Sequence, residues 1–554
     1  MDDYYDLGSY SRKVSTRSAA AQAWFDRGLN WLYAFNQEDA EVCFRNAVDE
    51  DPRCAMAWWG LAYSIGPYYN WPWEKFDATA LGPALRGSHD AARTALGLRD
   101  GVSGPERALI DAMARRSPSP SRPTDFQDWI EDYACAMREA YHAWPRDLDV
   151  ATLFADAVMT RTPWKLWNLR TGEPAEGAST LEARAVLESA LRQVEDEGAP
   201  PHPGLLHFYI HLLEMSPFPE QALRAGDQLY GLVPDAGHLH HMPTHIDFQC
   251  GHYHNVVVRN ASALVADHKH VAREGALNLY AYSRIHNAHF MLYGAMFLGQ
   301  SRTAMEAADE IVASLPEALL RIESPPMADI LEGYLGMKVH ALIRFGRWQE
   351  IIEERLPSDT ELYCVTVALG LYAKAVAYAA TGDIPAAEEH RERFEAARER
   401  VPPSRLLFNN TCRDVLAIAS EMVCGEIEYR RGDHATAFVH LRNAVTLEDN
   451  LPYDEPWGWM QPTRHALGAL LLEQDEFEQA EAVYRSDLGF DPEVIRARRH
   501  PDNVWALHGL HEALRRQGKE HEAGMIAPRL DLALARADVT IESSCYCRMH
   551  TQAR

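Results

Sequence analysis

The chain has 554 residues, with 54 Lys and Arg against 80 Asp and Glu, which gives a formal net charge of −26. That excess of negative charge repels phosphate backbones, so we expect no nucleic-acid partner. No apolar run reaches the 18 or so residues that a membrane-spanning helix requires, and the start, Met1-Asp2-Asp3-Tyr4-Tyr5-Asp6, is acidic. Nine cysteines without a framework spacing suit a reducing compartment. We therefore expect a cytoplasmic protein with no membrane partner.

Residues 24–52 place large and small side chains at a spacing that two packed helices need. The residues are Trp24, Gly28, Trp31, Ala40, Phe44, Ala47 and Pro52. Small residues let two helix backbones approach, larger ones fill the space around them, and the proline stops the second helix. This spacing resembles the tetratricopeptide repeat, a pair of short antiparallel helices over 34 residues.

The same frame returns near the other end of the chain, and weaker copies lie between. The late copy carries Leu467, Gly468, Ala480, Tyr484 and Pro492. The weaker copies have a glycine at the expected turn, at Gly251, Gly299, Gly346, Gly382, Gly432 and Gly518. Because each repeat can bury its apolar face only against its neighbours, we predict an all-α fold. The resemblance implies a tetratricopeptide-like helical-repeat superhelix, or α-solenoid, with a concave inner groove.

We predict a single α-solenoid over residues 1–554, divided by how well the repeat is kept. Its segments are N-terminal repeats at 20–70, an irregular helical segment with loops at 71–200, histidine-rich repeats at 201–316, C-terminal repeats at 317–535 and a tail at 536–554. Within the irregular segment, apolar spacing predicts helices at 125–143 and 179–196. The tail contains Cys545-Tyr546-Cys547, a spacing that suits a soft metal, a redox pair or an ordinary tail.

Histidines occupy the predicted inner stripe of three successive repeats. Tetratricopeptide arrays present the first helix of each repeat to the concave surface, and residues at helical spacing share that face. Of twelve stripe positions in the histidine-rich repeats, seven are histidine, where 25 histidines in 554 residues predict about 0.5. The stripe also holds Glu214 and Tyr293. The seven histidines are His207, His211, His238, His241, His245, His286 and His289.

These side chains indicate a transition-metal site. Residues four apart on a helix lie about 5–6 Å apart on one face, so the pair at 207 and 211 can chelate one ion. Neutral imidazole suits copper, iron, nickel and zinc. We predict that the seven histidines and Glu214 bind one or two ions, with copper or iron favoured and zinc as the alternative. The competing interpretation is a histidine groove without metal, which binds an acidic peptide or transfers protons.

The histidine strings also resemble a group of bacterial tetratricopeptide-like proteins. That group carries HxYIHxxE, GHLxHMPxH and HNxHF, and the chain shows these at 207–214, 237–245 and 286–290. It also shares Ala55-Met56-Ala57-Trp58-Trp59-Gly60 with the group. The resemblance supports the site and implies no particular reaction.

Three classes of function fit the sequence. We favour a metal-dependent enzyme, an oxidoreductase or oxygenase acting on a small molecule or peptide in the groove, with Glu214 and Tyr293 as catalytic residues. A zinc hydrolase at the same site, with Glu214 as base, is the alternative chemistry. The other classes are a metallochaperone and a non-catalytic interaction scaffold with a protein partner.

Overall fold

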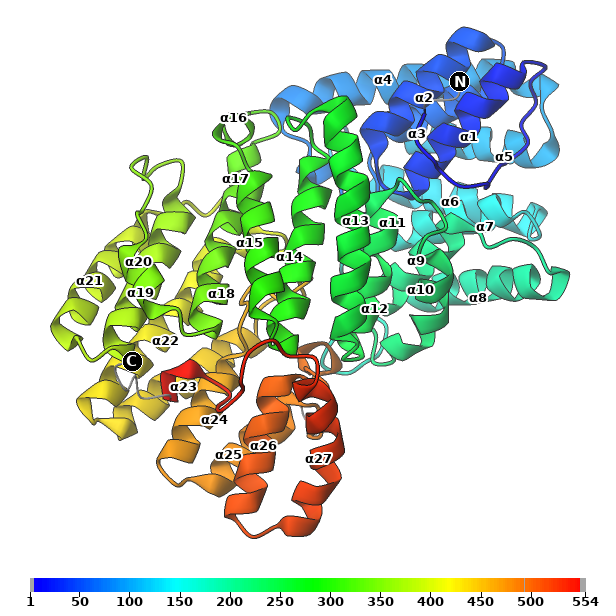
Figure 1. The fold of residues 1–554 in the computed structure, drawn as a ribbon. Helices are drawn as coiled ribbons and strands as arrows, with labels where there is room; N and C mark the ends of the chain where they lie inside the picture. Colours follow the sequence, from blue (N-terminus) through cyan, green and yellow to red (C-terminus); the bar gives the residue numbers. More distant parts are fainter. Residues whose placement is uncertain (1–3, 493, 549–554) are drawn as a thin grey trace. The chain divides into compact units, whose positions relative to one another are not determined.

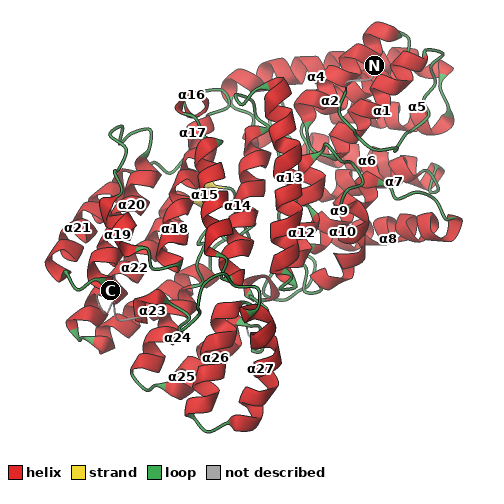
Figure 2. Ribbon diagram, viewed as in Figure 1, coloured by secondary structure: helices red, strands yellow, loops and turns green. Residues whose placement is uncertain are grey.

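The computed structural model describes residues 4–492 and 494–548. Helices make up nearly all of its regular structure (Figure 2). Two short strands, β1 (Leu406–Leu407) and β2 (Asn410–Thr411), pair antiparallel. The predicted all-α fold is confirmed. Among the described residues, no helix is both long enough and apolar enough to cross a membrane.

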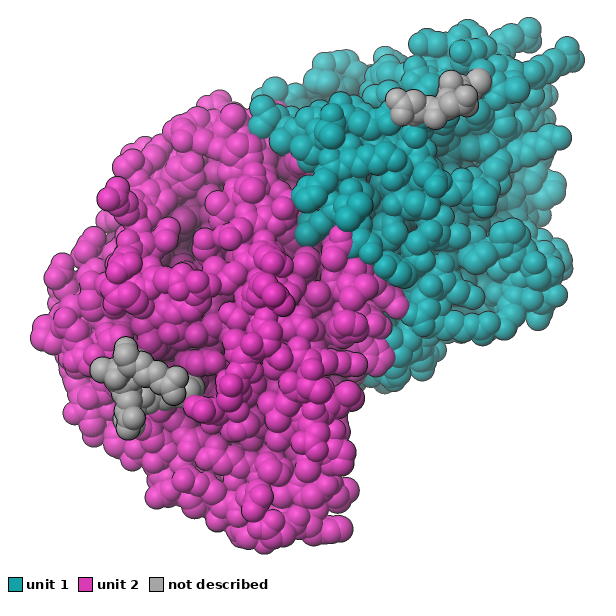
Figure 3. Space-filling model, viewed as in Figure 1, with its two compact units in different colours: residues 1–246, 262–280 teal, residues 247–261, 281–554 magenta. Residues whose placement is uncertain are grey.

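The chain divides into two compact units (Figure 3). Unit 1 contains residues 1–246 and 262–280, and unit 2 contains residues 247–261 and 281–554. Two helices, α12 (Pro243–Gln249) and α13 (Tyr253–Glu274), contribute residues to both units.

Unit 1 is a succession of paired helices, labelled in Figure 1. Neighbours in the chain pack against each other from α1 with α2 onward, as tetratricopeptide-like hairpins do. The helices are α1 (Ala19–Tyr33), α2 (Gln37–Glu50), α3 (Ala55–Ile65), α4 (Ala78–Leu98), α5 (Gly104–Arg116), α6 (Gln127–Ala143), α7 (Leu148–Met159), α8 (Thr180–Glu197), α9 (Pro203–Leu213), α10 (Leu223–Leu229) and α11 (Gly237–His241).

Unit 2 repeats the arrangement, with α20 on α21 and α22 on α23 among its most extensive contacts. A segment at 538–548 follows the last helix. The helices are α14 (Ala281–Leu298), α15 (Ser301–Ala313), α16 (Glu317–Leu320), α17 (Met327–Leu331), α18 (Met337–Arg344), α19 (Trp348–Glu353), α20 (Cys364–Ala380), α21 (Ile384–Arg400), α22 (Cys412–Arg431), α23 (His434–Asp449), α24 (Thr463–Glu473), α25 (Phe477–Asp487), α26 (Val504–Arg516) and α27 (Glu520–Leu534).

The segment predicted as irregular contains regular hairpins. Between 71 and 200 the chain forms α4 to α8, and α6 and α8 match the helices predicted at 125–143 and 179–196 to within two residues. The loops at 117–126 and 160–179 interrupt the 34-residue spacing. The repeat frame is therefore lost in the sequence while the helix pairs remain.

An aromatic ring wedged between two glycines fixes the spacing of hairpins at both ends of the chain. A Cβ atom on Gly28 or Gly60 would lie 2.8 or 2.3 Å from the ring of Phe44. At the other end, a Cβ atom on Gly468 or Gly509 would lie 2.5 or 2.2 Å from the ring of Tyr484. Only glycine permits this close approach, which explains why the 34-residue repeat is easiest to recognise in the sequence at these two places.

The turns inside the hairpins need a left-handed backbone, which glycine adopts without strain. Gly432 caps α22 with φ of 87°. Positive φ is also found at the other five turn glycines predicted from the sequence, Gly251, Gly299, Gly346, Gly382 and Gly518. In the turn between α1 and α2 a phenylalanine, Phe35, takes this conformation with φ of 54°.

Two glycine substitutions should have opposite effects on stability. Gly28→Ala forces a methyl group against the Phe44 ring, so we expect the free energy of unfolding to fall by about 1–3 kcal/mol. The matched control is Gly97→Ala in α4, where an added Cβ meets nothing within 4 Å. There we expect a gain of about 0.5–1 kcal/mol from helix propensity. Chemical denaturation of both variants tests this, and an equal effect of the two would contradict the wedge.

Candidate metal centre

Helix α9 carries the first histidine pair. Pro203 occupies the first turn, and the His202 side chain caps the helix by accepting a hydrogen bond from the Leu205 N–H at 3.2 Å. Gly204 follows Pro203, and a Cβ atom added to this glycine would lie 2.7 Å from the ring of Tyr33. The helix thus packs directly onto α1. His207 and His211, four residues apart, have ring centroids 4.7 Å apart and no exposed surface.

Helix α11 brings a third histidine to this pair. It begins at Gly237, where a Cβ atom would lie 2.1 Å from the carboxylate of Asp267. This close approach places His238, one residue later, with its Nε2 atom 3.2 Å from Nε2 of His207. One ring nitrogen from each of His207, His211 and His238 lies within 4.8 Å of the other two. Two imidazole ligands of a tetrahedral zinc ion would be about 3.3 Å apart, from Zn–N distances of about 2.0–2.1 Å.

Hydrogen bonds at Nδ1 orient two of these rings. Nδ1 of His207 donates to the backbone carbonyl of Tyr33 at 2.6 Å, and Nδ1 of His211 donates to Glu214 at 2.9 Å. A neutral imidazole that donates from Nδ1 keeps a lone pair on Nε2. Nε2 of His211 is buried and has no hydrogen-bond partner among the described residues. Metal-binding histidines nearly always show this pattern, with the far ring nitrogen bonded to a carbonyl or carboxylate.

Glu214 connects this trio to two further histidines. Its second carboxylate oxygen accepts a hydrogen bond from Nδ1 of His245 at 2.7 Å, and Nε2 of His245 lies 2.7 Å from Nε2 of His241. The ring centroids of His238 and His241 are 5.9 Å apart. We call these five histidines of unit 1, with Glu214, the histidine cluster: His207, His211, His238, His241 and His245.

Burial keeps the trio neutral. It lowers the pKa of His207 to about 3 and the pKa of His211 and His238 well below the ordinary value, with neighbouring imidazoles adding to the effect. At neutral pH these rings are therefore uncharged, which is the protonation state that binds metal ions.

Aromatic rings enclose the cluster. The ring of Phe35 lies 4.4 Å from that of His207 and stacks on those of His211 and His238 at 5.5 and 5.6 Å. Tyr69 and Trp164 cover His211 at 5.0 and 5.6 Å. Phe35 and Trp164 both have positive φ, of 54° and 61°. A left-handed conformation costs an ordinary residue about 1–2 kcal/mol, and such strain gathers at functional sites.

Sequence reasoning missed these aromatic walls. Tyr69 and Trp164 lie in the stretch without a legible repeat, so no stripe position pointed to them. A signal existed for Phe35: at the turn where six other hairpins carry glycine, the first hairpin carries a phenylalanine. A bulky residue where the backbone favours glycine indicates a side chain retained for its contacts.

The remaining predicted site residues lie on α14, in unit 2. His286 stacks on Phe408, another residue with positive φ, at 5.8 Å. Nε2 of His289 lies 2.8 Å from the sulfur of Met460, and burial lowers the pKa of His289 to about 3. Tyr293 is fully buried beside Phe297, and burial raises its pKa well above the ordinary value. Convergence of these residues with the histidine cluster remains a prediction.

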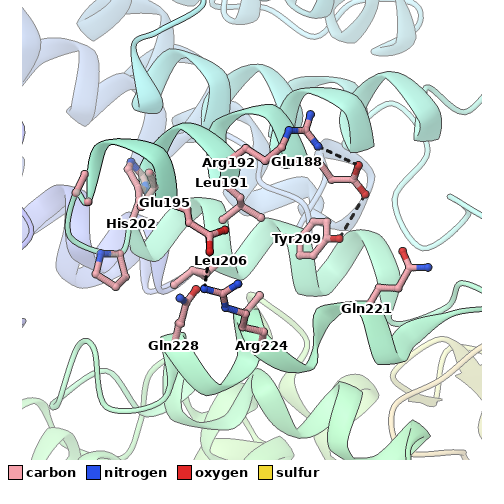
Figure 4. A pocket seen from close by; sticks show the side chains of 15 residues that line it. Glu188, Leu191, Arg192, Glu195, His202, Leu206, Tyr209, Gln221, Arg224 and Gln228 are labelled. Atoms are coloured by element: carbon pink, nitrogen blue, oxygen red, sulfur yellow. Dashed lines mark hydrogen bonds and ion pairs between the residues drawn. The ribbon is translucent and has the colours of Figure 1, made fainter.

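Unit 1 also has a groove of about 380 Å³ (Figure 4). Leu206 and Tyr209 of α9 line it, together with residues of α8 and α10. Arg192 and Glu188 form an ion pair along α8, and Arg224 of α10 forms an ion pair with Glu195 of α8. With its charges already paired and His207 and His211 absent from its lining, this groove has no convergent ligands.

The sequence matches no family model and no curated protein. Several solved structures are similar along most of the chain. They include Naa15/Naa10 bound to HypK (15% identity, 93% of this chain, 70% of that chain, TM-score 0.22), the human IFIT1 dimer with m7Gppp-AAAA (10%, 94%, 92%, 0.30) and yeast Tom70 (10%, 92%, 99%, 0.28). At these scores the similarities carry no inference about function.

Replacing Phe35 tests whether its ring protects the three imidazoles. Phe35→Gly relieves the left-handed strain but opens the wall over three imidazoles to water, so we expect metal affinity to fall at least about tenfold, as for lost supporting residues. The matched control is Asp475→Gly, at the equivalent turn between α24 and α25, where φ is 58°. Isothermal titration should show unchanged affinity for the control; equal affinities for both variants would show that the Phe35 wall is dispensable.

Proposed function

We propose that the histidine cluster binds a transition-metal ion and that the chain is a metal-dependent enzyme. The observation that carries the proposal is the trio of buried, neutral imidazoles with converging nitrogens, two of them oriented through Nδ1. A fold alone does not require such an arrangement, because each buried nitrogen left without a partner costs about 1–3 kcal/mol.

The residues divide into ligands and a positioning group. His207, His211 and His238 would hold the first ion. His241 and His245 would hold a second ion or serve as alternative ligands of the first. Glu214 was expected to be both ligand and base. Since each of its carboxylate oxygens accepts a hydrogen bond from a histidine Nδ1, we assign it instead to holding the His211 and His245 rings in place. Its function is to keep the proton on Nδ1 and the lone pair on Nε2.

The all-imidazole donor set favours copper, iron or zinc. A bound copper or iron ion would supply oxidation chemistry, and a bound zinc ion would polarise water or a carbonyl group. We favour an oxidoreductase or oxygenase acting on a small molecule or peptide. The enclosing rings of Phe35, Tyr69 and Trp164 limit water at the imidazoles, which suits a redox site.

Two alternative functions are each favoured by one observation. The 3.2 Å separation of Nε2 in His207 and His238 matches tetrahedral zinc geometry, which favours a hydrolase. Stacked helix hairpins favour a non-catalytic scaffold with a protein partner. A scaffold would not need the strained aromatic residues over buried histidines. Tyr293 remains a proposed catalytic residue, and His286 and His289 remain proposed ligands.

Removal of one ligand tests the proposal. We expect His211→Ala to lower metal affinity by at least about 10–100-fold, the range seen when only a supporting residue is lost. The control is the adjacent Leu212→Met, because Leu212 is fully buried and needs its volume conserved. Bound metal is measured by plasma mass spectrometry after reconstitution with copper, iron and zinc. Stoichiometric metal in His211→Ala, or none in the wild type, would leave the scaffold as the better account.

The positioning role of Glu214 has its own test. Glu214→Gln keeps the shape but offers one acceptor oxygen and one amide group, so only one of the two Nδ1–H groups keeps its acceptor. We expect metal affinity to fall about 10–100-fold with little change in the far-ultraviolet circular dichroism spectrum. Competition titration against a chelator measures this, and wild-type affinity in the variant would refute the assignment.

A further inference from the structure

Two cysteines of the segment 538–548 in unit 2 are joined by a disulfide. Cys545 and Cys547 flank one tyrosine, and their Cα atoms are 5.2 Å apart. The other seven cysteines of the chain form no disulfide. The histidine cluster uses neither cysteine, so this pair needs a separate explanation.

The residue before the pair anchors the segment. The Ser544 hydroxyl donates to the backbone carbonyl of His465 at 2.8 Å and lies 2.6 Å from the Tyr484 hydroxyl. The carbonyl of Ser544 accepts a hydrogen bond from Arg344 at 2.9 Å. All these groups are buried. The backbone around the cysteines is thus fixed by contacts that do not involve sulfur, so opening the disulfide would leave both thiols within bonding range.

The two sulfurs differ in access. Cys545 is partly exposed, and Cys547 is only 3% exposed. The backbone N–H of Cys547 donates to Sγ of Cys545 at 3.2 Å. Arg430 donates to the Cys547 carbonyl, and Arg548 forms two hydrogen bonds of 2.7 Å with Glu512. The two guanidinium groups are thus bound to a carbonyl and a carboxylate, and the contact that would stabilise a thiolate on Cys545 is the Cys547 N–H. A reactive cysteine also needs partial exposure, which Cys545 has.

Most other thiols in the chain have the opposite environment. Burial raises the pKa of Cys43 to about 12 and the pKa of Cys54 and Cys424 to about 11. It also raises the pKa of Cys364 and, well above the ordinary value, that of Cys412. Thiols that stay protonated are poor nucleophiles. Exchange at these five cysteines is therefore disfavoured.

We propose that Cys545 and Cys547 form a thiol–disulfide exchange site for low-molecular-weight disulfides. In the reduced protein the Cys545 thiolate attacks one sulfur of the small disulfide, forms a mixed disulfide and releases one small thiol. The Cys547 thiolate then attacks Sγ of Cys545, closes the internal disulfide and releases the second small thiol. Two electrons pass from the protein to the small disulfide, and the two thiol protons leave with the products.

Thiol counting in the full-length protein tests the exchange, with glutathione and its disulfide as probes. After excess glutathione disulfide we expect seven titratable thiols in place of nine, and excess glutathione should restore nine. Mass spectrometry should place the loss of two hydrogen atoms in the peptide with both cysteines. If glutathione disulfide does not oxidise the pair in the folded protein, the dithiol is inert and the proposal is wrong. If glutathione does not reduce the pair again, the disulfide is structural and the proposal is also wrong.

Single variants test the order of attack. Cys547→Ser removes the resolving thiol, so Cys545 should accumulate one equivalent of glutathione as a stable adduct. Cys545→Ser leaves only the buried sulfur and should accumulate none there. Cys135→Ser, which removes an exposed cysteine elsewhere, should exchange as the wild type does. An adduct on residue 547 in Cys545→Ser, or none on residue 545 in Cys547→Ser, would contradict the assigned roles.

Discussion

The structure of unit 1 depends on burying several imidazoles together with their lone pairs directed inward. Burial lowers the pKa of His207, His211 and His238, so the rings can stay side by side without charge repulsion. Their polar nitrogens still need partners. The Tyr33 carbonyl and Glu214 supply them to Nδ1 of His207 and His211, and Nε2 of His207 lies 3.2 Å from Nε2 of His238. The inward nitrogens are then available to an ion. Metal binding would repay the cost of burying Nε2 of His211 without a hydrogen-bond partner among the described residues.

The repeat fold is what makes this arrangement rigid. Gly204 lets α9 lie directly on Tyr33, three residues before His207. Gly237 lets α11 lie directly on Asp267, one residue before His238. Phe35 closes the arrangement from the turn after α1, in a conformation that glycine would adopt more easily. Close contact through small residues, which packs the helices of repeat proteins, thus also sets the separation of the imidazole nitrogens.

The sequence predicted the fold well where an aromatic residue sits between glycines, as Phe44 and Tyr484 do. Helical spacing likewise predicted that His207 and His211 share one helix face. It also predicted that the histidines at 238–245 lie on the same inner surface. It could not distinguish the two roles proposed for Glu214, because the carboxylate is one turn from His211 whether it binds an ion or orients a histidine. It also missed Tyr69 and Trp164, which long loops bring to the cluster. Tertiary contacts of this kind leave no period in a sequence.

X-ray absorption spectroscopy of the metal-reconstituted protein would identify the atoms that bind the ion. For zinc we expect about three imidazole nitrogens bound to the ion at about 2.0–2.1 Å, with the outer-ring scattering typical of histidine and no sulfur. A shell that contains sulfur would place the ion at the cysteine pair or at a methionine, and a shell of oxygen atoms alone would place it on surface carboxylates. Either result would contradict a metal centre built from His207, His211 and His238.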